Sequence, residues 1–92
     1  MRYPIAIEVG SETTTYGVVV PDLPGCFSAG DAIDEAMRAA EEAAVAWIDA
    51  TLDAGGVVPS PSSIATLRAQ ADYAGWAFAF IQLDRTLLQR HS

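Results

Sequence analysis

The sequence predicts a small α+β domain in which a three- to four-stranded, mostly antiparallel sheet carries one long helix across a face. Three observations lead to this fold class. The 92 residues leave room for a single domain. Short segments with strand patterns lie near both ends of the chain, and a long segment with helical spacing lies between them. The expected order of elements is therefore β-β-β-α-(α)-β.

Three strands precede the long helix. Residues 3–9 place a large apolar side chain at every second position, and residues 13–20 are rich in β-branched residues. These two segments predict an antiparallel hairpin. Residues 21–25 hold two prolines and a glycine, so the chain must leave the sheet there. Residues 26–29 are long enough for a short third strand.

The long helix is predicted to begin after Asp31 and to end at Gly55. Asp31 is a good N-cap residue, and the acidic residues that follow it suit the positive end of a helix. Apolar residues recur at helical spacing on one face, and charged residues occupy the opposite face. The predicted apolar face consists of Ile33, Met37, Ala40, Ala44, Trp47, Ile48 and Thr51.

A short helix and a last strand complete the domain. Ser63 suits the N-cap of the short helix. Residues 76–83 predict a strand with two apolar faces, so we expect it to be central in the sheet or covered on both sides. A place in the core or in an oligomer interface is expected for its aromatic residues Trp76, Phe78 and Phe80.

Acidic residues dominate the charge. Twelve Asp and Glu face five Arg, which gives a net charge of −7. In residues 1–54, two arginines and ten acids give 2 − 10 = −8. Such a chain repels nucleic-acid phosphates and attracts basic partners, although at this point the acidity could also serve solubility alone. No apolar run is long enough to span a bilayer and no signal peptide begins the chain, so we expect a cytoplasmic protein.

The residues of common catalytic and metal sites are missing from the sequence. No nucleotide-binding or hydrolase motif is present. His91 is the only histidine, and Cys26 has no histidine nearby that could activate its thiol. Glu8 and the helix acids are expected to point in different directions, which disfavours a magnesium-dependent nuclease site. We therefore expect no enzyme activity, no metal, no cofactor and no DNA-binding residues.

Residues 16–31 carry a distinctive motif. It consists of a Tyr-Gly strand, the turn Pro-Asp-Leu-Pro-Gly, and Gly-Asp shortly before the Glu-Ala start of the long helix. With this motif the chain resembles the HicB antitoxin family over residues 1 to about 84. The resemblance implies a partial ribonuclease-H-like domain without catalytic carboxylates. A structural role is expected for the motif residues Tyr16, Gly17, Pro21, Gly25, Gly30 and Asp31.

The resemblance also implies a partner. Similar proteins bind and neutralise HicA, a small basic toxin that cleaves messenger RNA, and they form homodimers or larger homo-oligomers. We expect the toxin to bind at the sheet edge and at the loop after the second strand, through Asp22, Leu23, Pro24 and Phe27. Two other functions stay open, namely a standalone acidic interaction module and, with less support, a residual metal-dependent nuclease.

The expected domain organisation follows from the same resemblance. Residues 1–84 form the HicB-like toxin-binding domain, and residues 85–92 form a short C-terminal tail. Family members commonly continue into a ribbon–helix–helix or helix–turn–helix domain that binds DNA. The 92 residues do not contain such a segment and are acidic, so we expect no DNA binding by this chain alone.

Overall fold

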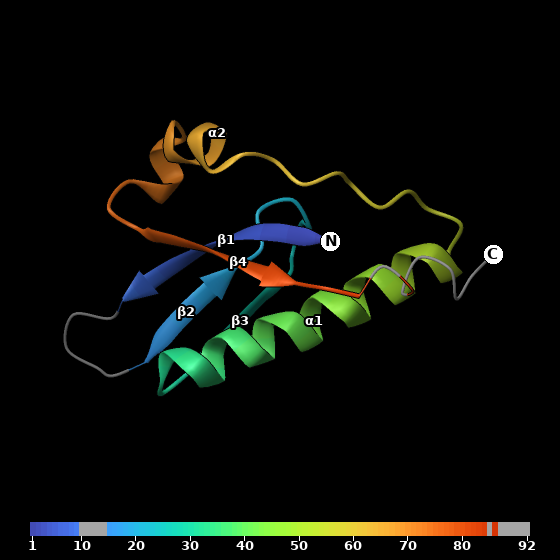
Figure 1. The fold of residues 1–92 in the computed structure, drawn as a ribbon, viewed down its shortest axis with the longest axis horizontal. Helices are drawn as coiled ribbons and strands as arrows, with labels where there is room; N and C mark the ends of the chain where they lie inside the picture. The colour runs from blue at the N-terminus through green and yellow to red at the C-terminus, as the bar shows by residue number, and fades with distance from the viewer. Residues whose placement is uncertain (10–14, 85, 87–92) are drawn as a thin grey trace.

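The computed structural model describes residues 1–9, 15–84 and 86 as a four-stranded antiparallel sheet with a long helix across one face (Figure 1). The strand order is β3-β2-β1-β4, and the order of elements along the chain is the predicted one. The α+β class is thereby confirmed, while the ribonuclease-H-like detail stays a prediction. The elements are β1 (Arg2–Val9), β2 (Tyr16–Val19), β3 (Phe27–Gly30), α1 (Ile33–Asp53), α2 (Ile64–Arg68), the 3-10 helix η1 (Ala71–Tyr73) and β4 (Ala77–Gln82).

Some predictions fall outside the described residues. The turn expected after the first strand and the first two residues of the expected second strand lie there, as do His91 and, except for Thr86, the expected tail 85–92. In the part of the chain that is described, no helix is both long and apolar enough to cross a membrane.

Reciprocal hydrogen bonds fix the pairing of β1 with β4. The Met1 ammonium donates to the Leu83 carbonyl at 2.7 Å, and the Leu83 amide donates to the Met1 carbonyl at 2.7 Å. Bonded and non-bonded pairs alternate along an antiparallel ladder, so Pro4 falls in a non-bonded pair opposite Phe80. On its other side, β1 pairs with β2 only from Ala6 onward. A proline without an amide hydrogen therefore costs this central strand no ladder bond.

The main core lies between α1 and the sheet. The helix buries Ala36, Ala40, Ala44 and Ile48, and all of these except Ala36 belong to the predicted apolar face. Three of the four are alanines, so the helix backbone can approach the sheet closely. Full burial of one large side chain such as Ile48 stabilises the fold by about 1.5–3 kcal/mol. The sheet and its loops contribute Tyr3, Ile5, Ile7, Val18, Val20, Leu23, Cys26, Ile81 and Leu83.

The start of α1 differs from the prediction that Asp31 caps the helix. The N-cap is Ala32, no side chain caps this end, and Asp31 lies exposed before it. The cause is a close contact between β3 and the first turn. A Cβ atom on Gly30 would lie 2.7 Å from the Ala36 nitrogen, and the Ser28 hydroxyl donates to the Ala36 carbonyl at 2.8 Å. Packing of β3 against the helix, rather than a side-chain cap, therefore fixes where α1 begins.

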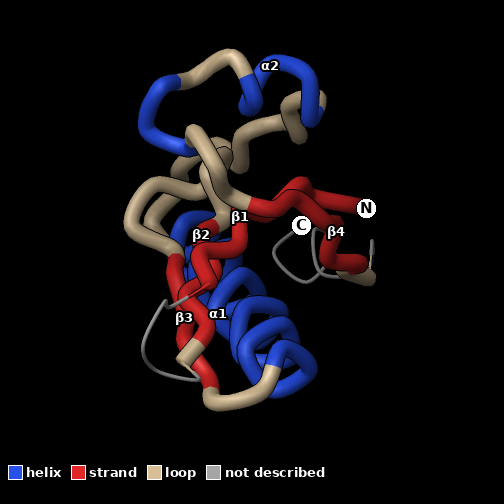
Figure 2. Tube along the Cα trace, turned by 90° about the vertical axis from the view of Figure 1, so that its left-hand side faces the viewer, coloured by secondary structure: helices blue, strands red, loops and turns tan. Residues whose placement is uncertain are grey.

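β4 is an edge strand, so the prediction of a central position is wrong, and each of its two faces is covered only in part. Ile81 is buried on the side of α1. On the other face, Phe78 contacts Tyr73 of η1, with ring centroids 6.5 Å apart, and the Arg68 guanidinium of α2 lies 5.7 Å from the Phe78 ring centroid. Consequently α1 and α2 lie on opposite sides of the sheet (Figures 1 and 2).

The helices α2 and η1 form a second layer that covers most of the aromatic side chains Trp76, Phe78 and Phe80. Trp76 lies edge-on to Tyr73 at 5.4 Å, and Ser63 caps α2 as predicted by accepting from the Thr66 amide. Phe80 is still 40% exposed, with the Arg2 guanidinium 4.2 Å from its ring centroid. The segment after α1 thus covers part of the apolar surface for which the sequence predicts a place in the core or in an oligomer interface.

Gly30 is the position where we expect added volume to be least tolerated. Gly30→Ala should lower the free energy of unfolding by about 2 kcal/mol or more, because the new methyl group forces β3 away from α1. Urea unfolding followed by tryptophan fluorescence measures this change. Gly17→Ala in the neighbouring strand is the matched control. Its Cβ would meet only Glu8 Cβ at 4.0 Å, so we expect a change within about 1 kcal/mol. Equal losses in both variants would contradict the role of the contact.

Candidate functional site

The loop between β2 and β3 is a compact turn held by its own backbone. The Leu23 amide donates to the Val20 carbonyl at 3.0 Å, and the Cys26 amide donates to the Leu23 carbonyl at 2.9 Å. The Val20 amide donates to the Cys26 carbonyl at 3.0 Å, which closes the loop onto the β2–β3 ladder. Gly25 has a φ of +82°, the left-handed conformation that a glycine adopts at little cost. The motif therefore gives this loop a fixed shape.

Two contacts from distant segments hold the loop in place. The Asp22 carboxylate accepts from the Ser62 amide at 2.8 Å and from the Ser62 hydroxyl at 2.5 Å. The Trp47 indole N–H of α1 donates to the Pro24 carbonyl at 2.8 Å. Because these bonds order the loop before any partner arrives, binding there loses little conformational entropy.

The four predicted contact residues lie in different surroundings. Asp22 is half-buried and bound to Ser62 rather than freely exposed. Leu23 is fully buried in the core, which removes its side chain from the expected contact surface. Pro24 is exposed, and Phe27 on the edge strand β3 is 71% exposed. Of the four predicted contact residues, Pro24 and Phe27 therefore lie on the surface at this edge.

The other motif residues serve the scaffold. Tyr16 is half-buried and packs against the core, while Gly17 lies in β2 opposite Glu8. Pro21 is half-buried at the start of the loop, and Gly30 allows the close approach of α1. Asp31 lies exposed before the helix and does not cap it.

Tyr3 ties the segment after α1 to the sheet. Its buried hydroxyl donates to the Pro59 carbonyl at 2.7 Å. Burial raises the pKa of the Tyr3 phenol above its ordinary value of 10.0, and the negative charge of Asp22 raises it further. The folded state therefore holds this proton more tightly than the unfolded chain does. Stability from Tyr3 is fully present below pH 10.0 and is lost as the pH rises above that value.

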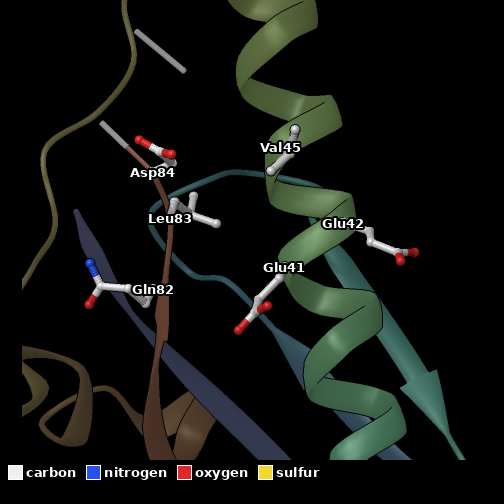
Figure 3. Close-up of a pocket in the computed structure, with 6 residues that line it drawn as sticks. All are labelled: Glu41, Glu42, Val45, Gln82, Leu83 and Asp84. Atoms are coloured by element: carbon white, nitrogen blue, oxygen red, sulfur yellow. The ribbon is translucent and has the colours of Figure 1, made fainter. Parts of the chain in front are cut away.

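A second surface feature is a pocket between α1 and the end of β4, with a volume of about 370 Å³. Figure 3 shows the Glu41 carboxylate between the helix and β4, Leu83 pointing toward the helix, and Gln82 pointing away from it. The pocket is lined by Glu41, Glu42, Val45, Gln82, Leu83 and Asp84. It combines apolar walls with carboxylates, and we refer to it as the acidic groove.

Sequence reasoning missed the acidic groove. Glu42 belongs to the stripe that was expected to face solvent, and Glu41 was assigned no role. A usable signal exists in the spacing, because Met37, Glu41 and Val45 recur every four residues along the flank of the apolar face. A carboxylate on such a flank lies at the boundary between helix and sheet.

The structure brings together no catalytic constellation among its described residues. Glu8 is exposed on the sheet face away from α1, so it is separated from the helix acids by the sheet itself. In the described ranges, no group of three His, Cys, Asp or Glu side chains could hold a metal ion. Cys26 is buried, and burial raises the pKa of its thiol, which keeps it protonated and unreactive.

Comparison with known proteins adds a family to this geometry. The sequence matches the family model of the HicB-like antitoxin of bacterial toxin–antitoxin systems over residues 3–92. It is 39% identical, over 88 residues, to an uncharacterised 14.9 kDa protein from the rep-hol intergenic region of Haemophilus phage HP1. That alignment covers 96% of this chain but only 65% of the phage protein, so the chain spans less than two thirds of this relative.

Two solved structures share the fold. One is the N-terminal domain of the antitoxin HicB from Burkholderia pseudomallei, with 35% identity and a TM-score of 0.79 over 91% of this chain and 99% of that domain. The other is a chain of the HicA3 and HicB3 toxin–antitoxin complex, with 30% identity and a TM-score of 0.69 over 91% of this chain and 99% of that chain. The four-stranded sheet with its long helix is thus the architecture of HicB N-terminal domains.

The bond between Asp22 and Ser62 should contribute measurably to stability. We expect Asp22→Ala to lower the free energy of unfolding by about 1–3 kcal/mol, because the Ser62 amide and hydroxyl lose their acceptor. Urea unfolding measures the loss. Asp72→Ala removes an exposed carboxylate on η1 and should change stability by less than about 0.5 kcal/mol. If Asp22→Ala were as harmless as this control, the loop would not depend on the bond.

Proposed function

Because the chain belongs to the family of HicB-like antitoxins of bacterial toxin–antitoxin systems, we propose that it binds and neutralises a small, basic, HicA-like toxin that cleaves messenger RNA. The match to the family over residues 3–92 is the observation that carries this proposal. Structural support comes from the likeness to a chain of the HicA3 and HicB3 complex. We place the activity in the cytoplasm, where messenger RNA is translated.

The charge of the chain suits such a partner. A net charge of −7 attracts a basic protein over distances of about 8–10 Å at ordinary salt, so it speeds association more than it strengthens the final contacts. An antitoxin of this kind needs no catalytic group, since covering the active surface of the toxin is sufficient for neutralisation. The buried thiol and the separated carboxylates are consistent with a binding role.

The exposed surface at the β3 edge is our proposed contact with the toxin. Phe27 offers a large apolar side chain, and Pro24 lies on a loop that is already ordered by Trp47 and Ser62. Aromatic anchors beside rigid backbone commonly dominate binding energy. Asp22 contributes by holding the loop, and Leu23 by filling the core beneath it.

Self-association into a homodimer or larger homo-oligomer stays a prediction. An oligomer interface is one of the two places that the sequence predicts for Trp76, Phe78 and Phe80. Since α2 and η1 cover much of this aromatic surface, it gives weaker support for self-association. Its remaining support is the apolar surface that the described chain leaves exposed, at Phe27, Val57 and Phe80.

An RNA cleavage assay tests the proposed function. The purified chain should protect messenger RNA from the basic protein encoded by the neighbouring reading frame, at a ratio near one chain per toxin. The chain alone, with Mg²⁺ or Mn²⁺ added, should leave the RNA intact. Cleavage by the chain that Glu8→Gln abolishes would support the nuclease alternative instead. Absence of any basic toxin gene beside its own would favour the standalone interaction module.

The contribution of Phe27 can be measured against a matched apolar residue. We expect Phe27→Ser to weaken toxin binding at least roughly tenfold, as truncation of a central aromatic anchor does. Val57→Ser is the control, because Val57 is 87% exposed and is not among the residues of the proposed contact. Isothermal titration calorimetry gives both affinities. Unchanged affinity for Phe27→Ser would remove this edge from the proposed contact surface.

A further inference from the structure

β4 is one of the two edge strands of this sheet. No described segment pairs with β4 on the side away from β1. The strand Ala77–Gln82 contains no charged residue and no proline, which are two usual means of protecting an edge strand from pairing with another chain. An unprotected edge of this length is suited to the addition of a strand from a partner.

The hydrogen-bond pattern identifies the groups that the edge presents. Leu83 and Met1 form a bonded pair, so by alternation Ile81 and Ala79 also bond inward to β1. The intervening residues Phe80 and Gln82, and Phe78 before them, therefore direct their amide and carbonyl groups outward. Three residues thus offer outward backbone donors and acceptors for a further strand.

The two faces beside this edge differ in chemistry. Toward α1 lies the acidic groove, where Glu41 stands between the helix and β4 and Leu83 and Val45 provide apolar walls (Figure 3). Among the described residues, Glu41 has no ion-pair partner. Toward the other face lies Phe80, 40% exposed, with the Arg2 guanidinium over its ring. A strand added here therefore meets negative charge on one face, and an aromatic ring with a cation on the other.

From this arrangement we propose that β4 and the acidic groove bind an extended segment of a basic protein partner by adding it as a fifth strand. The segment carries Lys or Arg at the positions that face α1, opposite Ala79 and Ile81, and apolar side chains at the positions that face Phe80. The aliphatic stem of each basic side chain lies along Val45 and Leu83, and its charged end reaches Glu41.

Charge favours this occupant over a second copy of the chain. A symmetric pairing of two β4 edges would bring two acidic grooves together, each with Glu41 and Glu42. The Met1 ammonium and Arg2 offset this only in part, because Arg2 lies on the opposite face and the ammonium is already bonded to the Leu83 carbonyl. A basic segment instead neutralises the groove. The inference rests on the proposed function only for the identity of the partner. Because β4 lies at the edge of the sheet opposite β3, it gives the toxin a second contact in addition to the one at Phe27.

Peptide binding tests this inference directly. The probe is a peptide of six residues, the length of β4, that alternates arginine and valine and is blocked at both ends. We expect it to bind and to slow the hydrogen exchange of the Phe80 and Gln82 amides, as followed by NMR. A peptide with glutamate in place of arginine should not bind. Binding of neither peptide, or slowed exchange at β3 instead, would overturn the inference.

Two pairs of variants separate the edge from the groove. Gln82→Pro removes an outward amide without breaking a bond to β1, so it should weaken peptide binding about fivefold or more, while Gln82→Ala keeps that amide and should weaken binding less. Glu41→Gln should weaken binding roughly threefold at low salt, whereas Glu35→Gln, with the same change in charge, should not. Circular dichroism checks that each variant is folded. If neither Gln82→Pro nor Glu41→Gln weakened peptide binding, the proposal would be overturned.

The remaining outcomes are also decisive. If light scattering shows a dimer that Gln82→Pro dissociates, a second copy occupies the edge and the inference is wrong. If the chain neutralises its toxin but binds no basic peptide, the proposed function stands and this inference fails. If it binds the peptide at β4 but protects no RNA, the docking site stands and the proposed function fails.

Discussion

The close contact between β3 and the first turn of α1 determines much of this structure. Gly30 leaves no room for a side chain above the Ala36 backbone, and the Ser28 hydroxyl bonds to the Ala36 carbonyl. The helix is thereby held against the β3 side of the sheet, where its buried alanines permit close packing. On the other side, α1 does not fully cover the end of β4. The acidic groove is the space that this offset leaves open.

The same frame explains why the domain suits binding rather than catalysis. The loop between β2 and β3 is fixed from α1 by Trp47 and from the following segment by Ser62. Its exposed residues are therefore presented on a rigid support, as recognition requires. A metal-dependent enzyme needs several carboxylates that converge on one point. Here the carboxylates are divided between the two faces of the sheet and the rim of the acidic groove. Membership of an antitoxin family agrees with this division.

Local patterns in the sequence predicted the order of elements, the apolar face of α1 and the cap at Ser63, because each depends on residues close together in the chain. The differences arise from contacts between distant segments. Asp31 has the chemistry of a cap, but packing of Gly30 on Ala36 fixes the helix start instead. Asp22 has the appearance of an exposed acid until Ser62, forty residues later, is placed beside it. The two apolar faces of β4 predicted that other elements would pack on both of them. They did not indicate that the strand lies at a sheet edge, or that the short helix α2 packs on one of its faces.

The central claim is that this acidic domain recognises a basic protein partner. The most direct measurement is the binding of the purified chain to the basic protein encoded beside it, followed by surface plasmon resonance at about 50 mM and about 200 mM salt, which gives both the affinity and the association rate. We predict a saturable complex at both concentrations, with slower association at the higher one because screening weakens the attraction between opposite charges. Absence of a complex at the lower salt concentration would contradict the claim.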